Sequence, residues 1–287
     1  MKHYISYIAT AGLALVLSAC EEVGPAINLG NTDKSVSDTT YVETTVEAPT
    51  DKHVLLEEFT GVRCINCPDG HIIIQSLKST YGEKVASAAF HTNDLGEPYN
   101  GATQDLRTAD GEILQDYLVY QGAKPSATVD RVKFSSGDIS PMYSKGTWSK
   151  HVQTELEKEA PLNIYIAPVY DSTTRTLSFT TELHYTKAVS EQQKISIFLL
   201  ETNLVQPQIN ASNVVDPNYI HRDVFRKAVT NIKGDPITTT TEAGRVVRST
   251  YITQLETIWK AENIRLLVFV HKYGTTEDIL QVREVAL

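Results

Sequence analysis

The chain has 287 residues, of which 41% are apolar and 21% charged, a composition typical of a globular body and not of a disordered or multi-span membrane protein. Its 26 basic and 35 acidic residues give a formal charge of −9. This charge argues against nucleic acid as a partner, because nonspecific binding needs clustered Lys and Arg. Three cysteines are too few for a disulfide framework, and at roughly 150 residues a domain the length suggests about two domains.

The first twenty residues have the pattern of a bacterial export signal. Residues 4–18 are mostly apolar, follow a short polar start and are too few to cross a membrane comfortably. They end in LSAC (17–20), and small residues directly before a cysteine resemble the lipobox of bacterial lipoproteins. The resemblance implies a signal peptide over residues 1–19 and lipidation of Cys20, with acyl chains such as palmitate in the bilayer. Ordinary signal cleavage with a free Cys20, or an uncleaved anchor, is the alternative.

The segment after the signal is polar. Glu21 and Glu22 resemble the surface-export signal of Bacteroidetes lipoproteins, which implies exposure on the cell surface; the alternative is that they begin a solvated linker. Residues 20–52 are rich in Thr, Ser, Asp and Glu, and we predict a lipidated N-terminus followed by a linker. Alternating apolar residues at 40–46 allow an edge strand within it.

From residue 53 to residue 160, strand and helix patterns alternate, which predicts an α/β domain. The expected elements are a buried strand at 54–59, a helix from about Cys67 to Gly82, a strand at 84–91, a helix at 103–119, a strand at 126–132 and an amphipathic helix at 146–159.

From residue 161 to residue 287 the apolar period becomes two, which predicts a β-sandwich domain. The expected strands are 162–169, 176–185, 194–200, 245–252, 264–273 and 279–285, with a further one at 220–228. Within that last strand, His221, Arg222, Asp223 and Arg226 are expected to form a solvated face, a binding site being the alternative.

One motif carries recognisable chemistry, the run CINCP (64–68), which follows a buried strand and opens a helix. Unpaired N–H groups and the helix dipole at such a position stabilise a thiolate on the first cysteine, and Arg63 adds a cation next to it. We therefore expect Cys64 to be an exposed nucleophile and Cys67 the more buried resolving thiol.

Two more residues fit the same site. Glu58, near the end of the first strand, can accept the proton of the resolving cysteine, and burial would raise its pKa toward neutral pH. The alternative is that Glu57 points inward and Glu58 outward, and alternation does not choose between them. A cis peptide bond at Pro125 would place backbone groups beside the dithiol for an extended substrate, although cis is the minority state of such bonds.

These features resemble the thioredoxin superfamily over residues 53–131, which shows a strand, a Cys-x-x-Cys helix, a strand, an inserted helix and a proline before a strand. The matching residues are Glu58, Cys64, Cys67 and Pro125. The resemblance implies that these four form a catalytic site.

More narrowly, the chain resembles the twenty-eight-kilodalton outer membrane lipoprotein family of Bacteroidetes, through LLEEFTGVRCINCPDGH (55–71), GAKPSATVDR (122–131) and YIHRDVFR (219–226). This resemblance implies a lipid-anchored outer membrane protein of the α+β class, with a thioredoxin-like α/β domain followed by an immunoglobulin-like β-sandwich. Members are often described as surface antigens or adhesins.

The sequence departs from working thioredoxins at the dithiol. Thr60 and Arg63 stand where those enzymes carry tryptophans, Ile-Asn replaces Gly-Pro, and a long insertion, roughly residues 92–120, can cover the site. Fast general reductase activity is therefore not expected.

Three functional hypotheses follow. In the first, the protein exchanges disulfides with a substrate through Cys64 and Cys67, with Glu58 moving the proton. In the second, it is an adhesin or interaction protein with an unknown protein partner, and the two cysteines form a structural disulfide. In the third, Cys64, Cys67, His71 and His91 bind a metal ion, the least favoured interpretation because the spacing of the histidines does not require one. No cofactor is expected.

Overall fold

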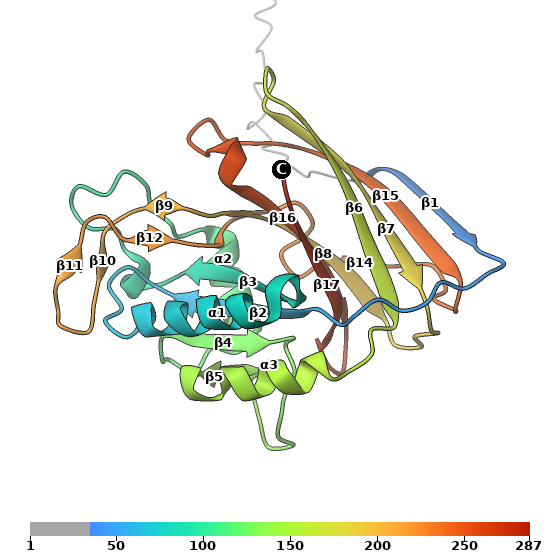
Figure 1. Ribbon diagram of the computed structural model, residues 1–287, viewed down its shortest axis with the longest axis horizontal. Coiled ribbons are helices and arrows are strands. Elements are labelled where there is room, and N and C mark those ends of the chain that lie inside the picture. The colour runs from blue at the N-terminus through green and yellow to red at the C-terminus, as the bar shows by residue number, and fades with distance from the viewer. Residues whose placement is uncertain (1–34) are drawn as a thin grey trace, which may run out of the picture. The chain divides into compact units, whose positions relative to one another are not determined.

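Strands dominate the part of the chain that the computed structural model describes, residues 35–287 (Figure 1). The predicted signal peptide, Cys20, Glu21, Glu22 and the first part of the predicted linker lie outside the described residues. Within the described part, no helix is both long and apolar enough to span a membrane.

Strands and helices alternate in the first half, as predicted. After β1 (Ser35–Val42), the elements are β2 (Val54–Thr60), α1 (Cys67–Tyr81), β3 (Val85–His91), α2 (Ala109–Tyr117), β4 (Ser126–Val129), β5 (Met142–Ser144) and α3 (Trp148–Leu156). Short 3₁₀ turns occupy Gly82–Lys84, Asp94–Gly96, Lys145–Thr147 and Ala261–Asn263. Buried along its whole length, β2 pairs in parallel with β3 and antiparallel with β4.

The alternation of side chains along β2 divides them between two layers. Its even-numbered apolar residues pack with Ile74 of α1 and Trp148 of α3, whereas its odd-numbered ones pack in a cluster with Leu114 of α2. Glu58 therefore points toward α1 and Glu57 toward the opposite layer, and both carboxyls are buried.

The second half is built of strands. They are β6 (Leu162–Asp171), β7 (Thr176–Tyr185), β8 (Gln193–Glu201), β9 (Leu204–Val205), β10 (Gln208–Ile209), β11 (Val215–Asp216), β12 (Ile220–His221), β13 (Val224–Ala228), β14 (Asp235–Pro236), β15 (Arg245–Gln254), β16 (Ile264–Lys272) and β17 (Ile279–Ala286). Four of them form a sheet in the order β1-β15-β7-β6, and the pairs β10–β11 and β9–β12 form two short hairpin-like ladders.

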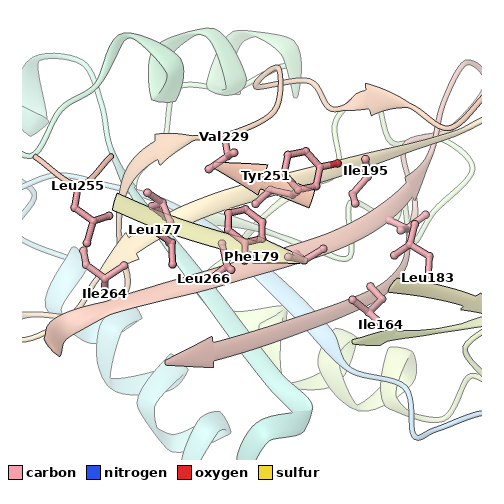
Figure 2. Close-up of a cluster of buried hydrophobic side chains, with 14 of the residues drawn as sticks. Ile164, Leu177, Phe179, Leu183, Ile195, Val229, Tyr251, Leu255, Ile264 and Leu266 are labelled. Carbon is pink, nitrogen blue, oxygen red and sulfur yellow. The ribbon is translucent and has the colours of Figure 1, made fainter. Parts of the chain in front are cut away.

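One long sheet joins the two halves, in the order β17-β16-β8-β13-β3-β2-β4-β5, with β14 added beside β8. The junction is β13, which pairs antiparallel with β8 and in parallel with β3, where Val224 meets Ala89. The four-stranded sheet packs on the β8-β16-β17 end of this sheet through a cluster that includes Phe179, Leu266 and Tyr251 (Figure 2). The fold is thus the predicted α+β arrangement, and the boundary at residues 160/161 stays a prediction, since strands from both sides share a sheet.

Some predicted boundaries differ from the structure. The helix expected at 103–119 begins at Ala109, because the Thr108 hydroxyl accepts the Gly111 N–H at 3.0 Å and so caps the first turn. The strand expected to reach residue 132 ends at Val129, since the next two residues have φ values of 48° and 54°. The strand expected at 220–228 is split into β12 and β13.

Candidate functional site

The cysteine pair lies at the start of α1, as predicted from the sequence. Cys64 and Cys67 form a disulfide with a Cα–Cα distance of 5.3 Å. Pro68 occupies the first turn of α1, where its missing N–H leaves no hydrogen bond unmade. The Cys67 N–H also donates to the Cys64 carbonyl at 3.3 Å, so backbone and sulfur atoms close the same short loop.

Glu58 and Pro125 meet beneath this first turn, at Gly70. A Cβ atom at position 70 would lie 2.8 Å from Glu58 Oε1, 3.1 Å from Pro125 Cγ and 3.1 Å from the indole of Trp148. The Lys124–Pro125 peptide bond is cis. The structure therefore brings Glu58, Pro125 and the helix that begins at Cys67 together, and the absence of a side chain at Gly70 allows the approach.

Burial gives Glu58 an unusual charge state. Its carboxyl is fully desolvated, and this burial, with a smaller contribution from the charge of Asp223, raises its pKa well above the ordinary value. Within residues 35–287, Glu58 Oε1 has no hydrogen-bond partner. Glu57 differs, because Arg131 binds its two oxygens at 2.6 and 2.7 Å and Thr128 donates at 2.9 Å. Burial thus favours the protonated form of Glu58, whereas Glu57 forms a buried ion pair with Arg131.

A row of three histidines begins beside this acid. His71 Nε2 lies 3.6 Å from Glu58 Oε2, and His71 Nδ1 lies 2.6 Å from the Tyr219 hydroxyl. The His221 ring is 5.2 Å from that of His91 and 6.3 Å from that of His71. Desolvation lowers the pKa of His71 to about 3 and of His221 to about 4, and that of His91 falls well below its ordinary value. All three rings are neutral at pH 7.

A cavity of about 200 Å³ opens beside Glu58. Its lining includes Glu58, His71 and Tyr219, together with Asp223. Asp223 is held by Lys78 at 2.7 Å and by the Ser87 hydroxyl at 2.6 Å. The cavity therefore gives the otherwise buried Glu58 carboxyl an opening on one side.

The prediction that His221, Arg222, Asp223 and Arg226 form a solvated face was wrong for most of these residues. His221 is 2% exposed and Asp223 is 6% exposed, whereas Arg222 lies on the surface. The Arg226 guanidinium is mostly buried beside Glu201, at 3.4 Å. The reason is the parallel pairing of β13 with β3, which brings this segment across the carboxyl end of β3 and onto α1.

The expectation of an exposed Cys64 was also wrong, because Cys64 is 4% exposed and Cys67 is fully buried. Gln208 Nε2 donates to the carbonyls of Cys64 and Gly61, at 3.1 and 3.3 Å. From the other side, the Arg63 N–H donates to the Leu95 carbonyl at 2.8 Å, so the start of the predicted insertion packs on the dithiol loop. These two segments cover the disulfide, and β10 lies beside the start of α1 (Figure 1).

The four residues of the metal hypothesis do not converge. The two sulfurs are bonded to each other. The two ring nitrogens of His71 form hydrogen bonds with the hydroxyl groups of Tyr219 and Thr60. Among residues 35–287, Cys64, Cys67, His71 and His91 do not form a cluster of ligand atoms.

Sequence reasoning did not find Gly70, Tyr219, His221 and Asp223 as parts of the site. Tyr219, His221 and Asp223 do lie in YIHRDVFR, the run that carried the family resemblance, but nothing local in it indicates contact with α1.

The fold is a thioredoxin-like α/β part joined to a β-sandwich. A family model described as outer membrane protein Omp28 matches residues 115–287, more than half of the chain, and the chain belongs to this family. The dithiol segment lies before the matched residues.

One solved structure of similar fold covers most of this chain. HBP35 of Porphyromonas gingivalis is 18% identical, with a TM-score of 0.63 over 84% of this chain and 77% of that one. A domain of the outer membrane lipoprotein Omp28 from Porphyromonas gingivalis is 20% identical, with a TM-score of 0.32 over 45% of this chain and 88% of that one. A search of curated proteins gave no match.

Proposed function

We propose that this protein is a thiol–disulfide oxidoreductase of the outer membrane, in which the Cys64–Cys67 disulfide exchanges with the thiols of a protein substrate. The observation that carries the proposal is Glu58, an acid with an unpartnered buried oxygen beneath the turn that Cys67 opens. Burying an unpaired polar group costs stability, and a disulfide that only closes a loop gains nothing from it. A perturbed pKa beside a reactive pair is typical of proton transfer.

The exchange begins when a substrate thiolate attacks Cys64 Sγ. A mixed disulfide forms between the substrate and Cys64, the Cys64–Cys67 bond breaks, and Cys67 leaves as a thiolate. Glu58 gives its proton to that thiolate, which prevents the reverse attack. A second substrate thiolate then attacks the substrate sulfur of the mixed disulfide and releases Cys64. The substrate dithiol is oxidised to a disulfide, and the Cys64–Cys67 pair is reduced.

Two neighbours of the dithiol support this sequence of steps. Pro125, in its cis form against Gly70, is the candidate for positioning an extended substrate backbone. The cavity beside Glu58 gives the acid a route for taking up a new proton from water. The covering segment at Gln208 must move before a substrate thiolate reaches Cys64, because this cysteine is 4% exposed.

The test is the reduction potential of the Cys64–Cys67 pair, measured by equilibrating the full chain in glutathione mixtures. We expect a value between about −120 and −270 mV, the range of working oxidoreductases. Glu58→Gln should slow exchange with a small dithiol at pH 7, whereas the exposed control Glu83→Gln should not. A potential below about −300 mV would assign the pair to the structural disulfides and overturn the proposal.

The burial of Cys64 favours a second candidate function, an interaction protein or adhesin with a structural disulfide. In that case the sandwich and the insertion bind a partner, and the sulfurs are covered because nothing reacts with them. Binding to host or bacterial surfaces should then survive the double substitution of Cys64 and Cys67 by Ser. Loss of binding by a folded double variant would contradict this candidate.

We also propose that the protein is held in the outer membrane by acyl chains on Cys20 and faces the cell surface. The sequence LSAC (17–20) and the two following glutamates support this. Labelled palmitate should be incorporated by the wild type and not by Cys20→Ala, and protease added to whole cells should degrade the protein. Incorporation by the variant would contradict the anchor.

A further inference from the structure

A second group of polar side chains lies on the four-stranded sheet and shares no residue with the dithiol site. Glu43 and Glu47 follow β1, and His184 belongs to β7; their ligand atoms, one from each, all lie within 4.8 Å of one another. His184 Nδ1 is 2.9 Å from Glu47 Oε1 and 3.8 Å from Glu43 Oε2. These distances bracket the separation of about 3.3 Å between tetrahedral ligands that each stand roughly 2.0–2.1 Å from a metal ion.

His184 itself points to a cation. Its side chain is only 10% exposed, and its Nε2 lies 3.3 Å from Glu182 Oε2. When the ring is neutral and its proton lies on Nε2, toward Glu182, the Nδ1 lone pair faces Glu47 and Glu43. Nδ1 is buried, and its nearest charged neighbours are the carboxylates of Glu47 and Glu43. Two carboxylates that converge on one ring nitrogen favour a positive charge among them, which a bound cation or a second proton on His184 can supply.

The neighbours of these residues orient them as ligands. Tyr165 and Asn163 donate to Glu47 Oε2 at 2.9 and 3.0 Å, which leaves Oε1 toward His184. Glu182 holds the outer nitrogen of His184, and Arg248 approaches Glu182 at 3.3 Å. A carboxylate on the outer nitrogen of a ligating histidine is the usual support of a metal-bound imidazole.

We propose that Glu43, Glu47 and His184 bind a first-row divalent cation of the Zn²⁺ class, with water completing the coordination. The imidazole nitrogen favours Zn²⁺ over Ca²⁺ and Mg²⁺, which prefer oxygen ligands alone. The site joins the segment after β1 to the sheet. The same segment is tied down further along, where Thr50 donates to Asn163 Oδ1 at 2.8 and 3.0 Å.

The experiment is calorimetric titration of the full chain, stripped of metal with a chelator and kept free of reductant so that the disulfide stays closed. Zn²⁺ should bind once per chain, and Ca²⁺ or Mg²⁺ at least tenfold more weakly. His184→Gln and Glu47→Gln should each weaken Zn²⁺ binding at least tenfold. His151→Gln, on α3 and against Phe134, is the matched control and should not change it.

A second readout does not depend on these variants. Hydrogen exchange of the backbone at 43–50 should slow when Zn²⁺ is added to the wild type, because the cation ties this segment to β7. The proposal is overturned if Zn²⁺ does not bind, if binding survives His184→Gln unchanged, or if Ca²⁺ binds as tightly. It is also overturned if NMR shows that His184 carries a second proton on Nδ1 at pH 7 in the presence of Zn²⁺.

Discussion

Glu57 and Glu58 are adjacent in the sequence, yet they have opposite chemistry because β2 directs them into different layers. Arg131 compensates the charge of Glu57 with two hydrogen bonds, and no cation of the described chain pairs with Glu58 Oε1. The pKa of Glu58 is accordingly raised, since the protein interior disfavours the charged form. Glu57 therefore takes part in a buried ion pair, and burial favours the protonated form of Glu58.

This difference predicts a pH dependence of stability for Glu58. The folded protein keeps the proton above the pH at which the unfolded chain releases it, so folding becomes less favourable as pH rises above about 4.5. The loss amounts to about 1.4 kcal/mol for each pH unit over which Glu58 stays protonated. Chemical denaturation at pH 5, 6 and 7 should show that Glu58→Gln lacks this loss, and parallel pH profiles for the two proteins would contradict it.

His221 should have the opposite pH dependence. Its pKa in the folded protein is about 4, below the ordinary value of 6.5, so the unfolded chain takes up a proton first as pH falls. Stability is therefore lost between pH 6.5 and pH 4, by up to about 3 kcal/mol. His221→Gln keeps a donor for the Gln206 carbonyl and should flatten the profile in this window. If chemical denaturation shows the same loss of stability between pH 6.5 and pH 4 in the wild type and the variant, the lowered pKa of His221 is contradicted.

At the scale of elements, the contact between α1 and β2 depends on Gly70. The methyl group of Gly70→Ala would meet Glu58 Oε1, Pro125 and Trp148 at 2.8 to 3.1 Å, so α1 or its neighbours must shift. We expect a loss of about 1–3 kcal/mol, as for other overpacked cores. The control is Gly146→Ala, whose added methyl group meets nothing within 4 Å. Equal stability of the two variants in urea denaturation would refute the close contact.

Local sequence patterns were sufficient to predict most helices and strands and part of the candidate site. Cys64, Cys67 and Glu58 lie within one strand, loop and helix start, so spacing and periodicity identify them together. Tyr219 and His221 reach the same place through the pairing of β13 with β3, between strands far apart in the sequence. Such a pairing leaves no local signal, and a polar run that packs across a buried strand end has the same composition as a solvated one.

At the scale of the whole molecule, the shared sheet makes the site a product of both halves. The thioredoxin-like half provides the disulfide, Glu58 and Pro125, and the β-sandwich half provides Tyr219 and the cover at Gln208. The halves also share a core, since Phe90 of β3 stacks on Phe225 of β13 at 4.6 Å. The pKa of Glu58 is therefore raised by burial in the first half of the chain and by the charge of Asp223 in the second half.

It follows that residues 48–160 should not fold alone, although their sequence has the pattern of a thioredoxin-like domain. Removal of β8 and β13 would expose the layer that contains Phe59, Phe90 and Leu114, at a cost of roughly 1.5–3 kcal/mol for each such side chain. That total rivals the 5–15 kcal/mol that stabilises a typical domain. Circular dichroism and amide NMR of the isolated segment should show no cooperative unfolding and poor dispersion. A cooperative transition would establish the boundary near residue 160 as that of an independent domain, with a site it can complete without the sandwich.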